Sequence, residues 1–360
     1  MKKIMFVFVV LALILAPIVY AKPSTVIVTI ELKASETLLR SGVSFINATL
    51  FSNSLDGKIT SSNNSYTIAC RNHSITIKPK SSLFTFDGKN GTFTSKQIPF
   101  IEKGKLKIPA RKLTELFGGK VEGKTLVFSK TILKDIVFLH HSCGSNWIAD
   151  GQIREKLTKA EFEFWDHGYN EEGLRNPKGD HTGTNYGVPG DNTNPDGYTN
   201  IFAQQRTNPP TNTLSHLLAH DVIIIKSCFP VSNIYSDEDL FVAKEHYKTV
   251  ISNMAKYPDK TFIIVTQPPM NRKATTKENA LRARKLANFL KSTDFLKSAP
   301  NVSTFDWFNM LAVSDQNSPY YSMLKPEYSP DGNDSHPNYT ANFNTSPEFV
   351  KFVVSKATKY

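Results

Sequence analysis

From about residue 131 onward, short continuous apolar runs alternate with longer segments of helical periodicity. The runs Ile136 to Leu139, Val222 to Ile225 and Phe262 to Val265 are typical of parallel strands covered on both faces, where neither face needs polar residues. Between and after the last two runs, Asp237 to Tyr257 and Lys277 to Lys291 carry apolar positions at helical spacing. The alternation predicts a doubly wound α/β domain with a parallel sheet. Its chemistry is expected beyond the carboxyl ends of the strands.

Residues 24–130 follow a different pattern, with short β-rich segments separated by Asn-Ser, Asp-Gly and Asn-Gly turn signals. Examples are Ser24 to Leu32, Tyr66 to Ile77 and Leu83 to Phe86. We therefore predict a small β-rich domain over 24–130, followed by the α/β domain over 131–360.

The chain begins with a basic Met1-Lys2-Lys3 and continues with an almost wholly apolar run from Ile4 to Val19, with small residues near Ala21. This pattern predicts a secretory signal peptide over 1–21, and an uncleaved N-terminal anchor is the alternative. In both cases we expect the remainder outside the cytoplasm, secreted or attached to the cell surface.

The formal net charge of +11 comes mainly from scattered lysines, with no basic run interleaved with aromatic residues. Nucleic acid is therefore not expected as a partner, and an anionic cell surface or polymer fits the charge better. Three cysteines, Cys70, Cys143 and Cys228, cannot all pair within one chain, which argues against a disulfide scaffold. We expect buried thiols, with a Cys143–Cys228 bridge as the alternative.

Candidate chemistry lies in two distant segments. Ser142 follows the first predicted parallel strand in a turn of small and polar residues, which exposes a hydroxyl as nucleophilic catalysis requires. Near the other end of the chain, His336 is a candidate base, because a histidine oriented by a carboxylate removes a serine proton well near neutral pH. Asp334 and Asp331 are both candidates to orient it.

Each assignment has a plainer alternative. Ser142 is otherwise an ordinary turn residue at the end of a strand. Cys143 is an alternative nucleophile with His336 as its base. The adjacent His140 and His141 point to opposite faces of a strand, so no shared metal site is expected, and His140 is expected in or near the core. We expect no cofactor.

The motifs resemble those of the SGNH (GDSL-like) hydrolase family. The family's serine follows the first strand, as Ser142 does, and its fourth strand has a Pro-Pro ending like Thr266-Gln267-Pro268-Pro269. The terminal Asp-x-x-His-Pro motif is approached by Asp331 to Asn338. The resemblance implies a serine ester hydrolase, in which Gly168, after the second strand, donates its amide to the oxyanion.

Two positions depart from the family pattern. Asn333 stands three residues before His336, where the family has Asp. The family's Gly-x-Asn-Asp after the third strand is replaced by Lys226 to Asn233, so the oxyanion donor there is expected to be Asn233, or else backbone amides alone.

Gly104 to Val121 reads as strand, short helix, glycine stop and strand. This order resembles the copper amine oxidase N-terminal-like stalk domain of secreted bacterial proteins, over about residues 24 to 130. The resemblance implies a spacer or wall-proximal role, with no catalytic residues and no copper site.

These patterns together predict a secreted serine esterase or acylhydrolase. Its expected partner is an ester substrate, with acylated polysaccharide or another cell-wall polymer as the candidate class. The alternative is a non-catalytic binding or adhesion module on the same fold, because one fold can host unrelated functions.

Overall fold

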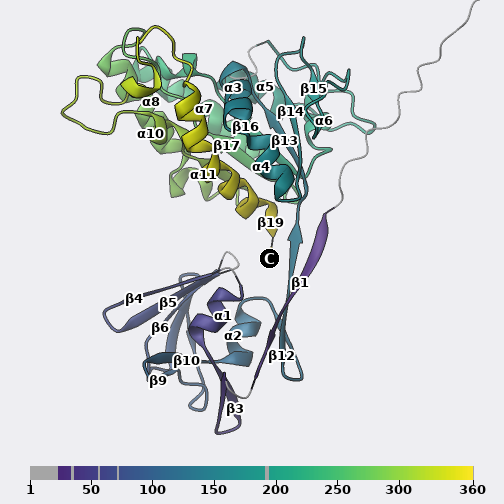
Figure 1. Cartoon of the computed structure of the whole chain (residues 1–360), viewed down its shortest axis with the longest axis vertical. Coiled ribbons are helices and arrows are strands. Elements are labelled where there is room, and N and C mark those ends of the chain that lie inside the picture. Colours follow the sequence, from purple (N-terminus) through teal and green to yellow (C-terminus); the bar gives the residue numbers. More distant parts are fainter. Residues whose placement is uncertain (1–22, 34–35, 56, 71–72, 191–193, 360) are drawn as a thin grey trace, which may run out of the picture.

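The structure, a computed structural model, describes residues 23–33, 36–55, 57–70, 73–190 and 194–359. Figure 1 shows a strand-rich part with short helices and a layered part of helices and strands. We call the segment from β1 to β12 the N-terminal region and the segment from β13 to α11 the C-terminal region. The predicted signal peptide lies outside the described residues. Among the described residues, no helix combines the length and apolar character needed to cross a membrane.

The C-terminal region is built on a six-stranded sheet in the order β15-β14-β13-β16-β17-β18. All neighbours pair in parallel except β15, which is antiparallel to β14. The strands are β13 (Asp135–Leu139), β14 (Glu163–His167), β15 (Leu174–Arg175), β16 (Val222–Lys226), β17 (Thr261–Val265) and β18 (Val302–Phe305). Every residue of β13, β16 and β17 is buried, as the continuous apolar runs predicted. The predicted α/β class with a parallel sheet is confirmed.

Helices cover both faces of this sheet. One face packs through Val137, Ile223 and Ile264 against α5 (Pro195–Phe202), α6 (Thr213–Leu217), α7 (Asp237–Met254), α8 (Lys277–Leu290) and α9 (Thr293–Leu296). The other packs through Phe138 and Ile224 against α3 (Ser142–Asp150), α4 (Ile153–Lys159) and α11 (Tyr339–Ala357). Helix α10 (Trp307–Leu311) contributes to both apolar clusters. The sheet is therefore doubly wound.

The order in which the strands are added to the sheet reverses next to β13. The chain goes from β13 to β14 on one side, and then crosses to β16, β17 and β18 on the other. In open parallel sheets such a reversal leaves a crevice at the carboxyl ends of the strands, where ligands bind. The first residues of α3 follow the carboxyl end of β13.

The N-terminal region has a separate apolar core. It includes the buried Ile46, Phe51, Ile75, Leu113 and Phe128. Its strands form three sheets, β1-β12-β11 with β19 beside β12, β2-β3-β10-β9, and β4 to β8 in sequence order. Their bounds are β1 (Ser24–Glu31), β2 (Thr37–Arg40), β3 (Val43–Asn47), β4 (Lys58–Ser62), β5 (Ser65–Cys70), β6 (His73–Ile77), β7 (Leu83–Phe86), β8 (Lys89–Thr92), β9 (Phe100–Glu102), β10 (Lys105–Pro109), β11 (Lys120–Glu122), β12 (Thr125–Ile132) and β19 (Thr358–Lys359). The helices are α1 (Ala48–Asn53) and α2 (Ala110–Leu116).

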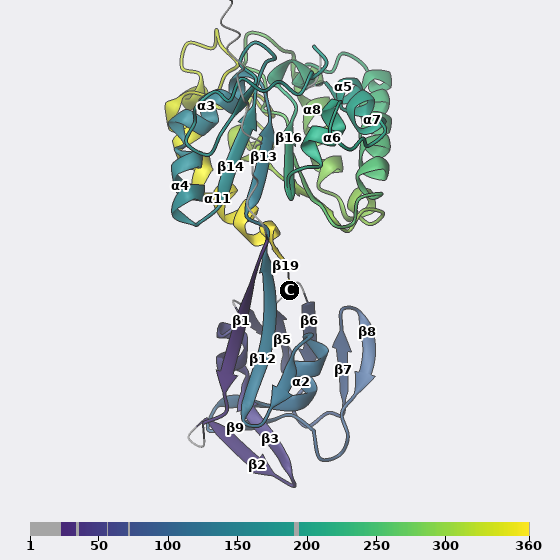
Figure 2. The same cartoon turned by 90° about the vertical axis from the view of Figure 1, so that its right-hand side faces the viewer.

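Strands β1 and β12 lie side by side where the two regions meet (Figure 2). They form an antiparallel ladder from Ser24 opposite Ile132 to Glu31 opposite Thr125. After α11 the chain returns to the same place, where β19 pairs with Thr131 and Ile132. The C-terminal region therefore begins and ends next to β12.

Several elements differ from the sequence-based expectations. Tyr66 to Ile77, expected as one β segment, is the hairpin of β5 and β6. Helix α1 was not expected, because six residues are too few to show helical periodicity. The order strand, helix and strand expected over Gly104 to Val121 is present as β10, α2 and β11.

Candidate active site

Ser142 is the first residue of α3, directly after the turn that ends β13. The buried strand stops at Leu139, His141 adopts an extended conformation before the helix, and the small Cys143 and Gly144 begin the first turn. Strand, short turn and helix therefore lift the Ser142 side chain to the carboxyl edge of the sheet, where it is partly exposed.

Ser142 meets His336 at this edge. The Ser142 Oγ lies 2.8 Å from the His336 Nε2. On the other side of the ring, Nδ1 lies 2.7 Å from an Asp334 carboxylate oxygen, which also accepts the His336 backbone N–H at 2.9 Å. Because Nδ1 donates to a carboxylate, Nε2 is the acceptor and faces the serine hydroxyl. The two distant sequence segments thus form one continuous Ser–His–Asp relay.

The carboxylate in this relay is Asp334. Burial raises the pKa of its carboxyl, but the backbone and ring N–H groups of His336 outweigh burial and hold the pKa below its ordinary value. Asp331 is turned instead to Asn333, whose backbone and side-chain N–H groups it accepts, both at 3.0 Å. Of the two candidates, the structure places Asp334 against His336.

The segment carrying His336 is held by residues that follow β17, which sequence reasoning did not single out. Asn271 donates its backbone and side-chain N–H groups to the Ser335 Oγ, at 3.1 and 2.7 Å. Arg272 donates to the carbonyls of Ser329 and Pro330, at 2.9 and 2.7 Å. These contacts tie the turn that carries His336 to the end of the fourth parallel strand.

The two cysteines beside the relay are free thiols, with their sulfur atoms 3.7 Å apart. Cys143 is fully buried, and its hydrogen bond to Cys228 together with burial raises the pKa of its thiol. The Cys228 Sγ is 4.0 Å from the Ser142 Oγ. Ser142, rather than Cys143, contacts the His336 Nε2, and a buried thiol of raised pKa is a poor nucleophile, so Ser142 is the favoured nucleophile.

Gly168 lies at the same edge as Ser142. It directly follows β14, where the carbonyl of His167 accepts the backbone N–H of His140 at 3.0 Å. A Cβ atom at this position would lie 3.2 Å from a carboxylate oxygen of Glu172, so a larger residue would crowd that side chain. The location suits a backbone donor beside the serine.

Asn233 is engaged elsewhere. Its side-chain N–H donates to the Tyr235 hydroxyl at 2.9 Å, and its oxygen accepts from Thr275 and Asn279, at 2.8 and 2.9 Å. These contacts use both ends of the amide, and Asn233 lines a surface pocket together with Pro195 and His246. None of the contacts described for Asn233 involves Ser142 or His336.

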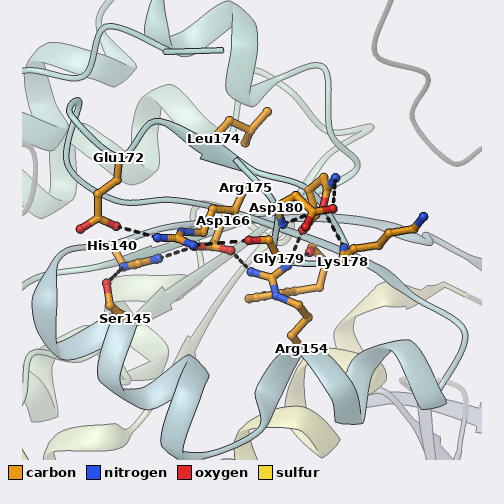
Figure 3. A network of polar contacts seen from close by, with 12 residues as sticks. His140, Ser145, Arg154, Asp166, Glu172, Leu174, Arg175, Lys178, Gly179 and Asp180 are labelled. Carbon is orange, nitrogen blue, oxygen red and sulfur yellow. Dashed lines mark hydrogen bonds and ion pairs between the residues drawn. The ribbon is translucent and has the colours of Figure 1, made fainter. Parts of the chain in front are cut away.

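A second serine, histidine and aspartate, Ser145, His140 and Asp166, lie close together (Figure 3). The Ser145 Oγ is 3.5 Å from the His140 Nδ1, and the His140 Nε2 is 3.1 Å from an Asp166 oxygen. However, Nδ1 also lies 3.0 Å from the carbonyl oxygen of His141, which can only accept. Nδ1 therefore carries a hydrogen and cannot remove a proton from Ser145. Of these two arrangements, only the Ser142 relay has a histidine nitrogen, Nε2 of His336, that can accept the serine proton.

No metal site is apparent in the described part of the chain, where no group of three or more His, Cys, Asp and Glu side chains has a suitable arrangement. His140 is buried, as the sequence predicted, and His141 stacks on Tyr169 with ring centroids 4.0 Å apart.

Comparison with known proteins gives only distant likenesses. No family model and no curated protein matches the chain. Among solved structures, a GDSL-like lipase from Bacteroides thetaiotaomicron is 12% identical with a TM-score of 0.36, and the match covers 62% of this chain and 89% of that one. A protein described as an acylhydrolase from Bacteroides fragilis is also 12% identical with a TM-score of 0.36, covering 68% and 95%. Likenesses this weak do not define an activity, so the chain's own geometry has to carry the functional conclusion.

Proposed function

We propose that this protein is a secreted serine esterase that uses Ser142, His336 and Asp334. The observation that carries the proposal is the unbroken relay from the Ser142 hydroxyl through both nitrogens of His336 to the Asp334 carboxylate, at 2.8 and 2.7 Å. A nucleophile in contact with a base, and a base oriented by a carboxylate, is the arrangement that acyl transfer requires.

The mechanism follows from these contacts. His336 takes the Ser142 proton as the Oγ attacks the ester carbonyl, and the imidazolium that forms is stabilised by Asp334. His336 then gives that proton to the departing alcohol, which leaves an acyl-serine. Water, deprotonated by the same histidine, hydrolyses the acyl-serine and regenerates the enzyme. The backbone N–H groups of Ser142 and Gly168 are the proposed donors to the oxyanion.

The exposure of the site suggests which esters it takes. The His336 side chain is 28% exposed and that of Asp334 is 67% exposed, so the relay lies near the surface. An open site suits a short acyl group carried on a large polymer. We therefore propose acylated polysaccharide or another cell-wall polymer as substrate, in keeping with the net charge of +11 and its attraction to anionic polymers.

The test is hydrolysis of short-chain aryl esters by the wild-type protein and by Ser142→Ala, with Ser145→Ala as the matched control. We expect Ser142→Ala to lose essentially all turnover and Ser145→Ala to retain it, because Ser142 contacts a free base and Ser145 does not. A fluorophosphonate probe should label the wild type at Ser142. Equal turnover by Ser142→Ala would refute the assignment, and absence of labelling in folded wild type would favour a binding module.

A further inference from the structure

Behind Ser142 lies a buried charged cluster that the proposed mechanism does not use. His140 is 1% exposed, Asp166 3% and Arg154 9%. Arg154 forms an ion pair with one Asp166 oxygen and donates to the carbonyls of Phe164 and Asn176, both at 2.7 Å. Buried charges are costly unless they are paired and hydrogen-bonded, so a cluster at this position calls for a specific role.

Both ring nitrogens of His140 face acceptors. Nδ1 faces the His141 carbonyl oxygen at 3.0 Å, and Nε2 faces an Asp166 oxygen at 3.1 Å. Burial raises the pKa of Asp166, but the hydrogen bond and charge of His140 and the charge of Arg154 outweigh burial and hold the pKa below its ordinary value. Asp166 is therefore a carboxylate. The His141 carbonyl oxygen can only accept, so the His140 Nδ1 that faces it carries a hydrogen.

The group that accepts the hydrogen of His140 Nδ1 is the His141 carbonyl, and this carbonyl links His140 to the proposed oxyanion hole. The His141 carbonyl belongs to the same peptide unit as the Ser142 N–H, and a peptide unit is rigid and planar. This carbonyl also accepts the N–H groups of Gly144 and Ser145, at 2.7 and 3.1 Å. Within the described residues the Ser142 N–H itself has no acceptor. Donors to the carbonyl fix the direction of this N–H and polarise it.

His140 also lies against the second proposed donor. A Cβ atom placed on Gly168 would be 3.7 Å from the His140 Cε1. The His140 ring therefore contacts the His141 carbonyl and lies next to Gly168, the two backbone segments that would face an oxyanion. Asp166 fixes that ring from β14, and Arg154 fixes Asp166 from α4 (Figure 3).

We propose that His140, held by Asp166 and Arg154, is a positioning residue that orients the Ser142 N–H, and with it the oxyanion hole, for the tetrahedral intermediate. The inference rests on the proposed esterase function. It assigns a role to the residue two positions before the nucleophile, which the sequence indicated only as a core histidine.

The chain contains a matched control. His220 and Asp135 form a second buried His–Asp pair, with Nδ1 2.7 Å from the carboxylate oxygen. Asp135 begins β13, whereas His140 follows its last residue, so the two pairs lie at opposite ends of one strand. At about 3.3 Å per residue, roughly 16 Å separate the two positions. Changes at His220 therefore test stability without touching the oxyanion hole.

The experiment compares His140→Phe, His140→Asn and His220→Phe in the full chain. We measure kcat and KM on an aryl ester and the inhibition constant of phenylboronic acid, which forms a tetrahedral anion on a reactive serine. His140→Phe should lower kcat about tenfold to a hundredfold and weaken boronate inhibition by a similar factor, with KM changed by less than about twofold, because the oxyanion exists only after attack. His140→Asn should restore part of the loss, since its side-chain N–H can replace that of Nδ1. His220→Phe should lower the melting temperature but leave kcat, KM and the inhibition constant near wild type.

Nitrogen-15 NMR of the histidine rings in the wild type gives a reading that does not depend on any variant folding. His140 should show a ring N–H group at Nδ1, and a ring without a hydrogen on Nδ1 would overturn the proposal. The proposal would also be overturned if His140→Phe kept the kcat and the boronate inhibition of the wild type, provided that fluorophosphonate labels Ser142 in the wild type. If Ser142 of the wild type is not labelled, the esterase function fails and this inference fails with it.

Discussion

Asp334 is selected as the orienting acid by a spacing of two residues. One of its oxygens accepts both the backbone N–H and the ring N–H of His336, at 2.9 and 2.7 Å. A single carboxylate oxygen thus fixes the main chain and the ring together, which limits rotation of the imidazole. Asn333 occupies the position where the resemblance led us to look for the acid, and its side chain bonds Asp331 instead.

The comparison of Asp334→Asn with Asp331→Asn tests this assignment. Asp334→Asn should lower kcat by a factor on the order of 10³ to 10⁴, because an amide does not favour the tautomer that leaves Nε2 free. Asp331→Asn should keep kcat within about twofold, since its carboxylate only bonds Asn333. Steady-state kinetics on an aryl ester checks both, and a larger loss in Asp331→Asn would contradict the assignment.

His167 makes stability depend on pH. Its Nε2 accepts the backbone N–H of Tyr186 at 3.1 Å, and its Nδ1 faces the carbonyl of Gly168 at 3.0 Å, so the buried ring is neutral. Burial lowers the pKa of His167 below the ordinary value of 6.5. Below pH 6.5 the His167 ring binds a proton in the unfolded chain but not in the folded chain. The free energy of unfolding therefore decreases as the pH is lowered from 6.5 to the pKa that His167 has in the folded protein.

Urea denaturation of the wild type and His167→Gln between pH 7 and pH 5 measures this effect. The free energy of unfolding of the wild type should fall more steeply toward pH 5 than that of His167→Gln, because glutamine does not titrate. The variant should be less stable at pH 7, where it loses the ring's packing against Tyr186, whose centroid is 5.0 Å away. Parallel pH profiles would show that His167 does not titrate with a lowered pKa.

The turn from Ser329 to His336 has little regular structure and depends on the segment after β17 for its position. Asn271 and Arg272 bind its two ends, and Lys273 contacts its middle at Asn333 with a distance of 2.9 Å. The contacts to Asn271 are buried, whereas the contact of Lys273 is exposed. The base is therefore positioned by one strand end and the nucleophile by another, β13, within a single rigid sheet.

We expect Arg272→Ala to impair both catalysis and stability. The variant loses the two hydrogen bonds to the carbonyls of Ser329 and Pro330, so His336 should be aligned for a smaller fraction of the time. We expect kcat to fall about tenfold. The free energy of unfolding should fall by about 1–3 kcal/mol, as for hydrogen bonds from a charged group. Lys273→Ala, which removes an exposed contact, is the control. It should change kcat by no more than about twofold and the free energy of unfolding by no more than about 1 kcal/mol.

The sequence predicted the parallel strands and the two site segments because each has a local signal. Buried strands appear as continuous apolar runs, and Ser142 and His336 each stand in a recognisable short motif. The contacts of Asn271 and Arg272 carry no such signal, since their partners are distant in the sequence. The role of His140 was also hidden, because a histidine at the end of a buried strand looks the same in the sequence whether it only packs or also orients a neighbouring peptide.

The two regions have separate apolar cores joined through β12 and its neighbours. All three tryptophans, Trp147, Trp165 and Trp307, lie in the C-terminal region. Tryptophan fluorescence therefore reports on that region alone, whereas far-ultraviolet circular dichroism reports on both. Separate cores favour separate unfolding transitions, because few apolar contacts link them.

Unfolding in denaturant should consequently give different midpoints by tryptophan fluorescence and by far-ultraviolet circular dichroism. Phe51→Ala removes a fully buried ring from the N-terminal core and should destabilise that region by about 3–5 kcal/mol. The midpoint from circular dichroism should move while the fluorescence midpoint stays in place. Coincident midpoints that shift together in Phe51→Ala would show instead that β12 couples the regions into one cooperative unit.

The register of β1 against β12 bears on how this protein would behave if it were tethered upstream of Ser24. Ser24 pairs with Ile132, the last residue of β12, just before the chain enters the C-terminal region. A tether would thus hold the C-terminal region close to its attachment point. The N-terminal region would not lie between the two, so it would not increase the distance between the attachment point and the C-terminal region. A pulling force on the C-terminal region would load this ladder at its Ser24–Ile132 end, so the hydrogen bonds would break in succession along the ladder, a geometry of low mechanical resistance.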